Sequence, residues 1–279
     1  MDIEADIIEF KVPIENNKTL FVWDILPTLT EAFIYESIWN IFSDFGALYL
    51  VKVCQNAAVA EPGFYAIVKF YSSAQASRAQ RATQGKGLFQ KSPLKVRLCT
   101  RQSHGFSYNV KGLSNYKCQE LANHYLGFNG WSSQVVTVQD ISSTDGAADA
   151  GAGQDSQALR LKYGCIIELS FPDHNASCRG MGVAEQSYQN FPGHMEVCLM
   201  RGKLQKYAKN NALADAFRKV LLVLLSNGRV VVECRFDPDE ILPDEDLTGV
   251  IKVSDISWDQ FENVEEEDSL SELTLNMSN

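Results

Sequence analysis

The stretch Gly63-Phe-Tyr-Ala-Ile-Val-Lys-Phe70 is rich in aromatic and β-branched residues, which favour strands. A second stretch of this kind, Leu20-Phe-Val-Trp-Asp-Ile25, is followed by Pro27, which stops a strand. Successive side chains of a strand point to opposite faces of the sheet. The two stretches therefore predict two strands, each with one face on a core and the other face open.

The alternation divides the side chains of these two strands into two sets. The set predicted to face a core is Leu20, Val22, Ala66, Val68 and Phe70. The set predicted to face outward is Phe21, Trp23, Tyr65, Ile67 and Lys69. Exposed aromatic rings can stack on unpaired bases, each stack being worth about 1–3 kcal/mol. Lys69, together with Arg97, is expected to contact phosphates, and Phe21 and Tyr65 are expected to carry the stacking.

Four further elements complete residues 18–101. The predicted order is strand Thr19–Ile25, a helix from Thr30 to Gly46, strand Tyr49–Cys54, strand Gly63–Phe70, helix Ser73–Thr83 and strand Leu94–Cys99. This βαββαβ order is that of a split-βαβ domain. Residues 1–17, which are dense in acidic side chains, are predicted to be flexible.

These two central strands resemble the paired signatures of the RNA recognition motif (RRM) family. The resemblance implies an RRM fold that binds single-stranded nucleic acid on its sheet. Two positions depart from the family pattern: Ile67 stands where a third stacking ring is usual, and Gly63 stands where Lys or Arg is usual. The departures imply weaker, less sequence-selective binding. The alternative is an RRM-like face that binds a peptide of a partner protein, beside a second module used for self-association.

A second α+β module is predicted over residues 105–236, with a sheet and helices. Its elements are helix Asn115–Leu126, strands Val135–Ile141, Leu159–Phe171 and Arg179–Glu185, helix Gln205–Leu225 and strand Arg229–Phe236. Residues 142–157 are dense in Gly, Ala, Ser and Asp, and they are predicted to form a flexible loop.

Two segments of this module resemble the annealing core of the Rad-fifty-two recombination mediators. Cys118–Trp131 contains L-A-N-H-Y-L-G-F-N-G-W, and Gly180–Glu185 reads G-M-G-V-A-E. With the N-A-A-V-A-E-P-G-F-Y and L-F-Q-K-S-P segments of the RRM, at 56–65 and 88–93, residues 10–255 are similar to the vertebrate family of Rad-fifty-two motif-containing proteins.

The resemblance implies a role in the DNA-damage response or recombination. Its implied ligands are single-stranded DNA and RNA, with some affinity for duplex DNA. A homo-oligomer, recombination or repair proteins as partners, and residence in nucleus and cytoplasm are also implied.

The resemblance also carries over individual residues. Arg218 and Lys219 fall on the basic pair of the family's DNA-groove helix, so they are predicted to contact phosphates. A third basic position falls on Leu222, and the groove tyrosine falls on Gly112, so these two contacts are lost. Trp131 is expected to pack in a core or turn and not to stack on a base.

The net charge of −10 conceals an uneven distribution. Residues 237–279 hold 14 acidic residues and one basic residue, and they are predicted to form a largely disordered tail. Residues 18–236 hold 23 basic and 16 acidic residues, a net charge of +7. A basic body with an acidic tail is common among nucleic-acid-binding proteins, and the tail can compete for the same surface. The alternative for the tail alone is a solvated, disordered terminus that maintains solubility.

Enzymatic, metal-binding and membrane-spanning functions find no support in the sequence. There is no phosphate-binding loop of the Walker type, and no histidine has a visible nucleophile or acid partner. The seven cysteines are scattered without a C-x-x-C pair, and Cys165, His174 and Cys178 lack a fourth ligand at zinc-site spacing. The sequence therefore predicts a non-enzymatic protein without cofactor or metal, and no run of 18 apolar residues predicts a membrane span.

Overall fold

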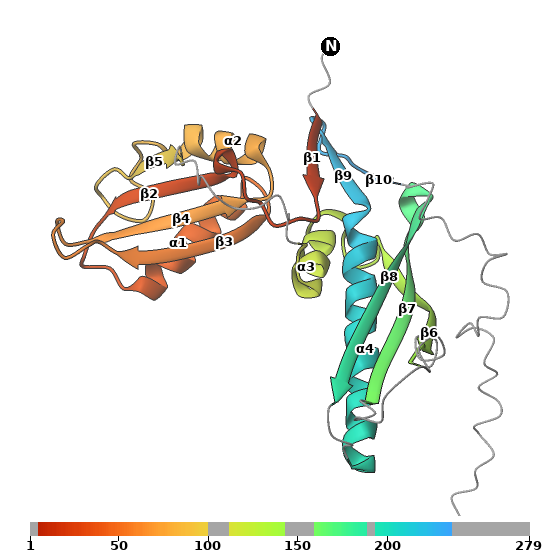
Figure 1. Cartoon of the computed structure of the whole chain (residues 1–279). Helices are drawn as coiled ribbons and strands as arrows, with labels where there is room; N and C mark the ends of the chain where they lie inside the picture. Colours follow the sequence, from red (N-terminus) through yellow and green to blue (C-terminus); the bar gives the residue numbers. More distant parts are fainter. Residues whose placement is uncertain (1–4, 100–111, 143–158, 189–192, 236–279) are drawn as a thin grey trace, which may run out of the picture.

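A computed structural model describes residues 5–99, 112–142, 159–188 and 193–235. Within these ranges the chain forms two α+β modules that contain three antiparallel sheets (Figure 1). The predicted acidic tail, residues 237–279, lies outside the described residues, as does nearly all of the predicted loop 142–157.

The first module has the predicted βαββαβ order and the RRM architecture. Its elements are β2 (Thr19–Ile25), α1 (Glu31–Ser43), β3 (Leu48–Gln55), β4 (Phe64–Phe70), α2 (Ser73–Thr83) and β5 (Lys95–Leu98), preceded by a short 3-10 helix, Asn16–Lys18. The strands lie in the order β3-β4-β2-β5. Strands β4 and β2 are therefore the central pair of the sheet, as the sequence predicts.

Local signals explain where the two helices begin and which face they bury. The hydroxyl of Thr30 accepts a hydrogen bond from the Phe33 amide at the start of α1, and the hydroxyl of Ser72 caps α2 in the same way. Ile34 and Ile38 of α1 are fully buried against the inward set of the sheet, all of whose members have no exposed area. The predicted inward face is therefore confirmed.

The second module joins a sheet, a long helix and a small sheet. Its elements are α3 (Asn115–Leu126), β6 (Ser132–Asp140), β7 (Leu159–Phe171), β8 (Ala176–Tyr188), α4 (His194–Arg218), β9 (Val220–Leu225) and β10 (Val230–Cys234), with a 3-10 turn at Pro172–His174. Strands β6, β7 and β8 form one sheet in that order, and α4 lies along one face of it (Figure 1).

Helix α4 lies unusually close to β8 because both contact surfaces are made of small residues. A Cβ atom on Gly180 would overlap the helix backbone at Ala212 and Ala216, and one on Gly182 would overlap it at Ala208 and Ala212. The three alanines are fully buried. The G-M-G segment is therefore a packing surface that brings a strand against a helix.

Two polar side chains of α4 and the lysine that follows it also cover the free edge of β8. Asn211 Nδ2 donates to the Val183 carbonyl at 2.9 Å, and the Met181 amide donates to Asp215 Oδ2 at 3.1 Å. Lys219, at the helix end, donates to the Arg179 carbonyl at 3.0 Å. Strand β8 ends the sheet, so these bonds satisfy backbone groups that another strand could otherwise pair with.

The prediction of one helix over Gln205–Leu225 is wrong at both ends. The helix already begins at His194 and it ends at Arg218, and Val220–Leu225 forms β9. Strand β9 pairs with β10 on one side and with a strand from the N-terminus of the chain on the other. A six-residue run of Val and Leu fits the middle of a small sheet, and periodicity alone does not distinguish it from a buried helix segment.

The prediction that residues 1–17 are flexible is also wrong where the structure describes them. Residues Ala5–Glu9 form β1, which pairs antiparallel with β9. Ile8 and Phe10 are buried in the second module, and the Phe10 ring lies 4.9 Å from that of Phe217. The acidic side chains at this end of the chain obscured its apolar positions. The second module therefore takes its first strand from the N-terminal side of the RRM.

The two modules are in direct contact where α2 meets β1 and α3. The Tyr125 hydroxyl accepts hydrogen bonds from the Ala47 amide at 3.4 Å and from Gln75 Nε2 at 2.9 Å. The Ser72 hydroxyl, which caps α2, donates to the carboxylate of Asp6 in β1. Tyr71, although it follows β4 directly, is 4% exposed and packs in the core of the second module. Burial raises the pKa of its phenol well above the usual range.

Candidate nucleic-acid interface

The open face of the RRM sheet carries three aromatic rings in contact. The Phe21 ring lies 5.5 Å from that of Trp23 and 5.2 Å from that of Tyr65. All three side chains are half-buried, as is Ile67, so each ring is held by the sheet and keeps part of its surface in solvent. The predicted outward set is confirmed, and Phe21 is at its centre.

Two cations flank Phe21 across the sheet. The strand register places Lys52 of β3 opposite Ile67 of β4, Ile67 opposite Phe21, and Phe21 opposite Arg97 of β5. Lys52 and Arg97 are exposed. Sequence reasoning missed Lys52, although its alternation with the buried Val51 and Val53 would have placed it on the open face.

Arg97 and one further cation, Lys69, lie beside the rings. The guanidinium carbon of Arg97 is 5.9 Å from the centre of the Trp23 ring, within cation–π range. Lys69, on β4, is half-exposed. Lys95 forms a 2.9 Å ion pair with Asp24, which leaves Lys52, Lys69 and Arg97 as the open-face cations with no ion-pair partner in the described ranges.

Tyr65 stays neutral at physiological pH. A hydrogen bond between its phenol and the Cys54 side chain on the neighbouring strand raises the pKa of the phenol. A neutral ring beside lysine and arginine adds no negative charge to repel a phosphate.

The end of β2 is held by a glutamine from the L-F-Q-K-S-P segment. Gln90 Nε2 donates to the Asp24 carbonyl at 2.8 Å, and its Oε1 accepts from the Leu26 amide at 3.1 Å. Asp24 adopts a positive φ of 65°, at an irregularity in the pairing of β2 with β4. Gln90 therefore fixes the backbone directly after Trp23 and orients the edge of the ring cluster.

Arg218 and Lys219, the basic pair predicted to contact phosphates, lie at the end of α4 in different surroundings. Arg218 is exposed, and a Cβ atom on Gly112 would lie 2.9 Å from its Nε, so glycine leaves room for the guanidinium. The Lys219 side chain is only 16% exposed and forms an ion pair with Asp215 at 3.5 Å in addition to its backbone bond. The geometry assigns Lys219 to the α4–β8 contact, and a phosphate contact stays a prediction for Arg218 alone.

Trp131 packs as the sequence predicts. Its ring lies 5.3 Å from that of Phe217, and its Nε1 donates to Asn123 Oδ1 at 2.8 Å. It therefore joins α3 to the core and is not a base-stacking platform.

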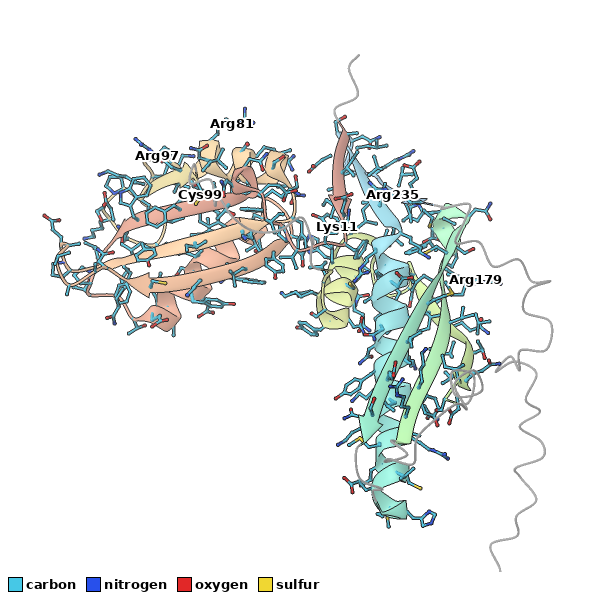
Figure 2. The ribbon with its side chains drawn as sticks, viewed as in Figure 1. Lys11, Arg81, Arg97, Cys99, Arg179 and Arg235 are labelled. Carbon is cyan, nitrogen blue, oxygen red and sulfur yellow. The ribbon has the colours of Figure 1, made fainter. Side chains whose placement is uncertain are left out.

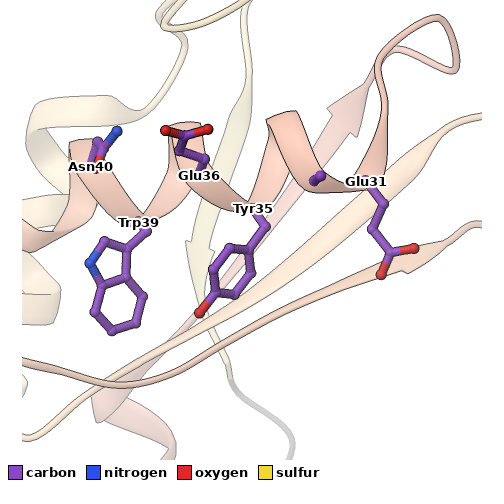
Figure 3. A pocket seen from close by; sticks show the side chains of 6 residues that line it. Glu31, Tyr35, Glu36, Trp39 and Asn40 are labelled. Carbon is purple, nitrogen blue, oxygen red and sulfur yellow. The ribbon is translucent and has the colours of Figure 1, made fainter.

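The outer side of α1 is acidic, in contrast to the open face of the sheet with its lysines and arginine. A shallow hollow there is lined by Glu31, Tyr35, Glu36, Trp39 and Asn40, with the Tyr35 and Trp39 rings stacked at 6.1 Å (Figure 3). This side of α1 faces away from the sheet. The carboxylates of Glu31 and Glu36 would repel a phosphate backbone, so this side of α1 does not suit a nucleic-acid strand.

Within the described ranges, no group of three or more His, Cys, Asp or Glu side chains is arranged to hold a metal ion. None of the helices in those ranges is long and apolar enough to cross a membrane.

Comparison with known proteins agrees with this architecture. Residues 26–93 match the RNA recognition motif family, and residues 113–221 match the RDM1 DSRM domain. The chain is 58% identical to RAD52 motif-containing protein 1 of Danio rerio over 98% of both chains. The chain belongs to this family. The Homo sapiens protein of the same name is 40% identical over 97% of this chain and 96% of its own length, so the resemblance drawn from the sequence is confirmed.

A more distant similarity covers part of the chain. The DNA repair and recombination protein radC of Emericella nidulans is 30% identical over 47% of this chain and 19% of its own length.

Proposed function

We propose that this protein binds single-stranded DNA and RNA on the open face of its RRM sheet, as a non-enzymatic component of DNA repair or recombination. The observation that carries the proposal is the cluster of Phe21, Trp23 and Tyr65, whose rings are in contact and half-exposed. Flat rings bind any unpaired base by stacking, because every base presents a π-face.

Binding in this site has a stacking part and an electrostatic part. Phe21 and Tyr65 supply rings on neighbouring strands, so two successive bases can stack side by side. Lys52, Lys69 and Arg97 surround them and neutralise backbone phosphates. With Ile67 in place of a third ring, the stacking is weaker than on a three-ring sheet, which favours low sequence selectivity.

The biological setting is proposed from the family and from the partial similarity to a DNA repair and recombination protein. We extend the proposal to some affinity for duplex DNA, to self-association, to contacts with recombination or repair proteins, and to residence in nucleus and cytoplasm.

The experiment that tests this function is titration of the full chain with fluorescent single-stranded oligonucleotides at several salt concentrations. Phe21→Ala with Tyr65→Ala should lower affinity at every salt concentration by about 30-fold or more, since two stacks of about 1–3 kcal/mol each are lost. The matched control is Phe33→Ala with Tyr35→Ala, which removes two exposed rings of the same kinds from α1. Equal binding by the two double variants contradicts the site.

The alternative predicted from the sequence, a peptide-binding RRM face, has its own result. Two results together would favour it. The native chain would show no salt-sensitive oligonucleotide binding, and it would bind a partner protein that the variant Phe21→Ala with Tyr65→Ala no longer binds.

A further inference from the structure

A polar cleft separates α2 of the RRM from the small sheet of the second module. It encloses about 690 Å³ and is lined by both modules. From the RRM come Ser73, Ala74, Ser77, Arg78 and Arg81 of α2. From the second module come residues of β1, Tyr125 of α3, and the ends of β9 and β10 with the turn between them.

The charged side chains that line the cleft are two arginines and one aspartate. Arg78 and Arg81 are exposed, and neither forms an ion pair within the described part of the chain. Arg81 Nε donates to the Ser77 carbonyl at 3.3 Å, which holds the guanidinium along the helix. Asp6 also lines the cleft, and its carboxylate accepts the hydrogen bond of the Ser72 hydroxyl. The arginines therefore give the cleft a net positive charge.

The cleft is close to the edge of the nucleic-acid interface. Helix α2 is attached to β5, because the Val96 amide donates to Gln84 Oε1 at 2.6 Å. Strand β5 is the edge strand that carries Arg97. Figure 2 shows Arg97 and Arg81 along the same edge of the RRM, on β5 and α2 respectively. Arg81, which lies along this edge, lines the cleft together with Arg78.

We propose that this cleft binds the phosphate backbone of a nucleic-acid strand that continues from the open face of the RRM sheet, an inference that rests on the proposed function. Bases stack on Phe21 and Tyr65, the backbone passes Arg97 at the β5 edge, and its phosphates then bind Arg78 and Arg81. Guanidinium groups suit this role because they bind phosphate oxygens through two parallel hydrogen bonds. The second module forms the other wall, so the binding site spans both modules.

The length of the oligonucleotide distinguishes the contribution of the cleft to affinity from that of the sheet. A strand of about 4 nucleotides covers the two or three bases that an RRM stacks, whereas about 12 nucleotides reach beyond the sheet. Arg78→Gln with Arg81→Gln in the full chain should leave affinity for the short strand unchanged. The same variant should weaken binding of the long strand roughly tenfold and reduce its salt slope by about 1–2.

The matched control is Arg160→Gln with Arg201→Gln, two exposed arginines of the second module outside the cleft. This control removes the same charge and should change the long-strand affinity by less than about twofold. Equal weakening by both double variants would mean that net charge, and not the cleft, determines long-strand affinity, and would overturn the inference.

Asp6→Asn provides a test by gain of affinity. The amide oxygen still accepts from Ser72, while the repulsion between the carboxylate and the phosphates is removed, so long-strand affinity should rise about two- to threefold. A structural defect would not strengthen binding. Unchanged or weaker long-strand binding by Asp6→Asn overturns the inference.

Two other outcomes distinguish an error in the cleft assignment from an error in the proposed function. If Phe21→Ala with Tyr65→Ala weakens both strands but Arg78→Gln with Arg81→Gln weakens neither, the cleft assignment alone is wrong. If Phe21→Ala with Tyr65→Ala changes nothing, the proposed function itself is wrong. A short poly-glutamate peptide that competes with the long strand but not the short one, and binds better to Asp6→Asn, would assign the cleft to an acidic protein segment in place of nucleic acid.

Discussion

The two larger sheets of this protein share one plan and differ in their open faces. Each is covered on one face by helix and is open on the other. On the RRM sheet the open face holds contacting rings among Lys52, Lys69 and Arg97, none of which has an acidic partner in the part of the chain that the structure describes. On β6-β7-β8 the corresponding face holds the exposed Met181 and Val183 and an ion pair between Arg179 and Glu168 at 2.8 Å.

The covered faces differ as well, and this difference explains the sequence motifs. Helix α1 of the RRM packs on the sheet through branched and aromatic side chains such as Ile34 and Phe42, which hold its backbone at an ordinary distance from the strands. Helix α4 packs backbone to backbone on Gly180 and Gly182. Motif residues in the RRM are therefore divided between the core and the open face of the sheet, whereas the two glycines of the G-M-G segment pack against α4.

The largest expected effect tests the close packing of α4 on β8. Gly180→Ala should lower the free energy of unfolding by about 3 kcal/mol, because the new methyl group overlaps helix backbone that cannot rotate away. Gly202→Ala is the matched substitution in the exposed first half of α4, where a Cβ atom meets nothing within 4 Å. It should stabilise by about 0.5–1 kcal/mol through helix propensity. Urea denaturation measures both, and equal effects would contradict the close packing.

A pair of tryptophans tests the division between core and ligand. Trp131→Ala should lower the unfolding free energy by about 2–3 kcal/mol, since it removes the contact with Phe217, and should leave affinity for a short oligonucleotide unchanged. Trp23→Ala should do the reverse, with a binding loss of about 1–2 kcal/mol. Denaturation and short-strand titration on the same two proteins distinguish the roles. Loss of affinity in Trp131→Ala without loss of stability would reverse the assignment.

The smallest expected effect concerns the two neighbouring basic residues at the end of α4. Lys219→Met should destabilise by about 1–2 kcal/mol, because Asp215 and the Arg179 carbonyl lose a partner, with no change in the salt dependence of binding. Arg218→Met should leave stability within about 0.5 kcal/mol and, if Arg218 contacts a phosphate, reduce the salt slope by about 1. A flatter slope in Lys219→Met would restore the paired role that the sequence predicts.

Strand alternation predicted the open RRM face well because that signal is local. Residues 20–25 and 63–70 each have a period of two, and neither strand depends on distant residues to decide which side chains face outward. Lys52 was within reach of the same reasoning. The contact of Trp131 with α3 and the core was likewise predictable from its place after a glycine-rich turn.

The small sheet was not predictable in this way. Strand β9 is an unbroken apolar run that local periodicity assigns equally to a helix, and its partner β1 lies more than 200 residues earlier in the chain. Pairing with β1 and with β10 favours a strand over a helix for β9, because both of its edges then form backbone hydrogen bonds. The role of Lys219 depends on the same kind of distant contact, with the free edge of β8.

The sequence by itself determined the RRM order, the ring-bearing face and the family, because these follow from alternation, caps and motifs within short segments. The tertiary structure decided which cations are free and which are held by carboxylates, and it brought α2 beside β1 and the β9–β10 turn to make a cleft. Whether a cation is paired, and where a cavity forms, depends on side chains from distant parts of the chain. A local sequence pattern does not contain that information.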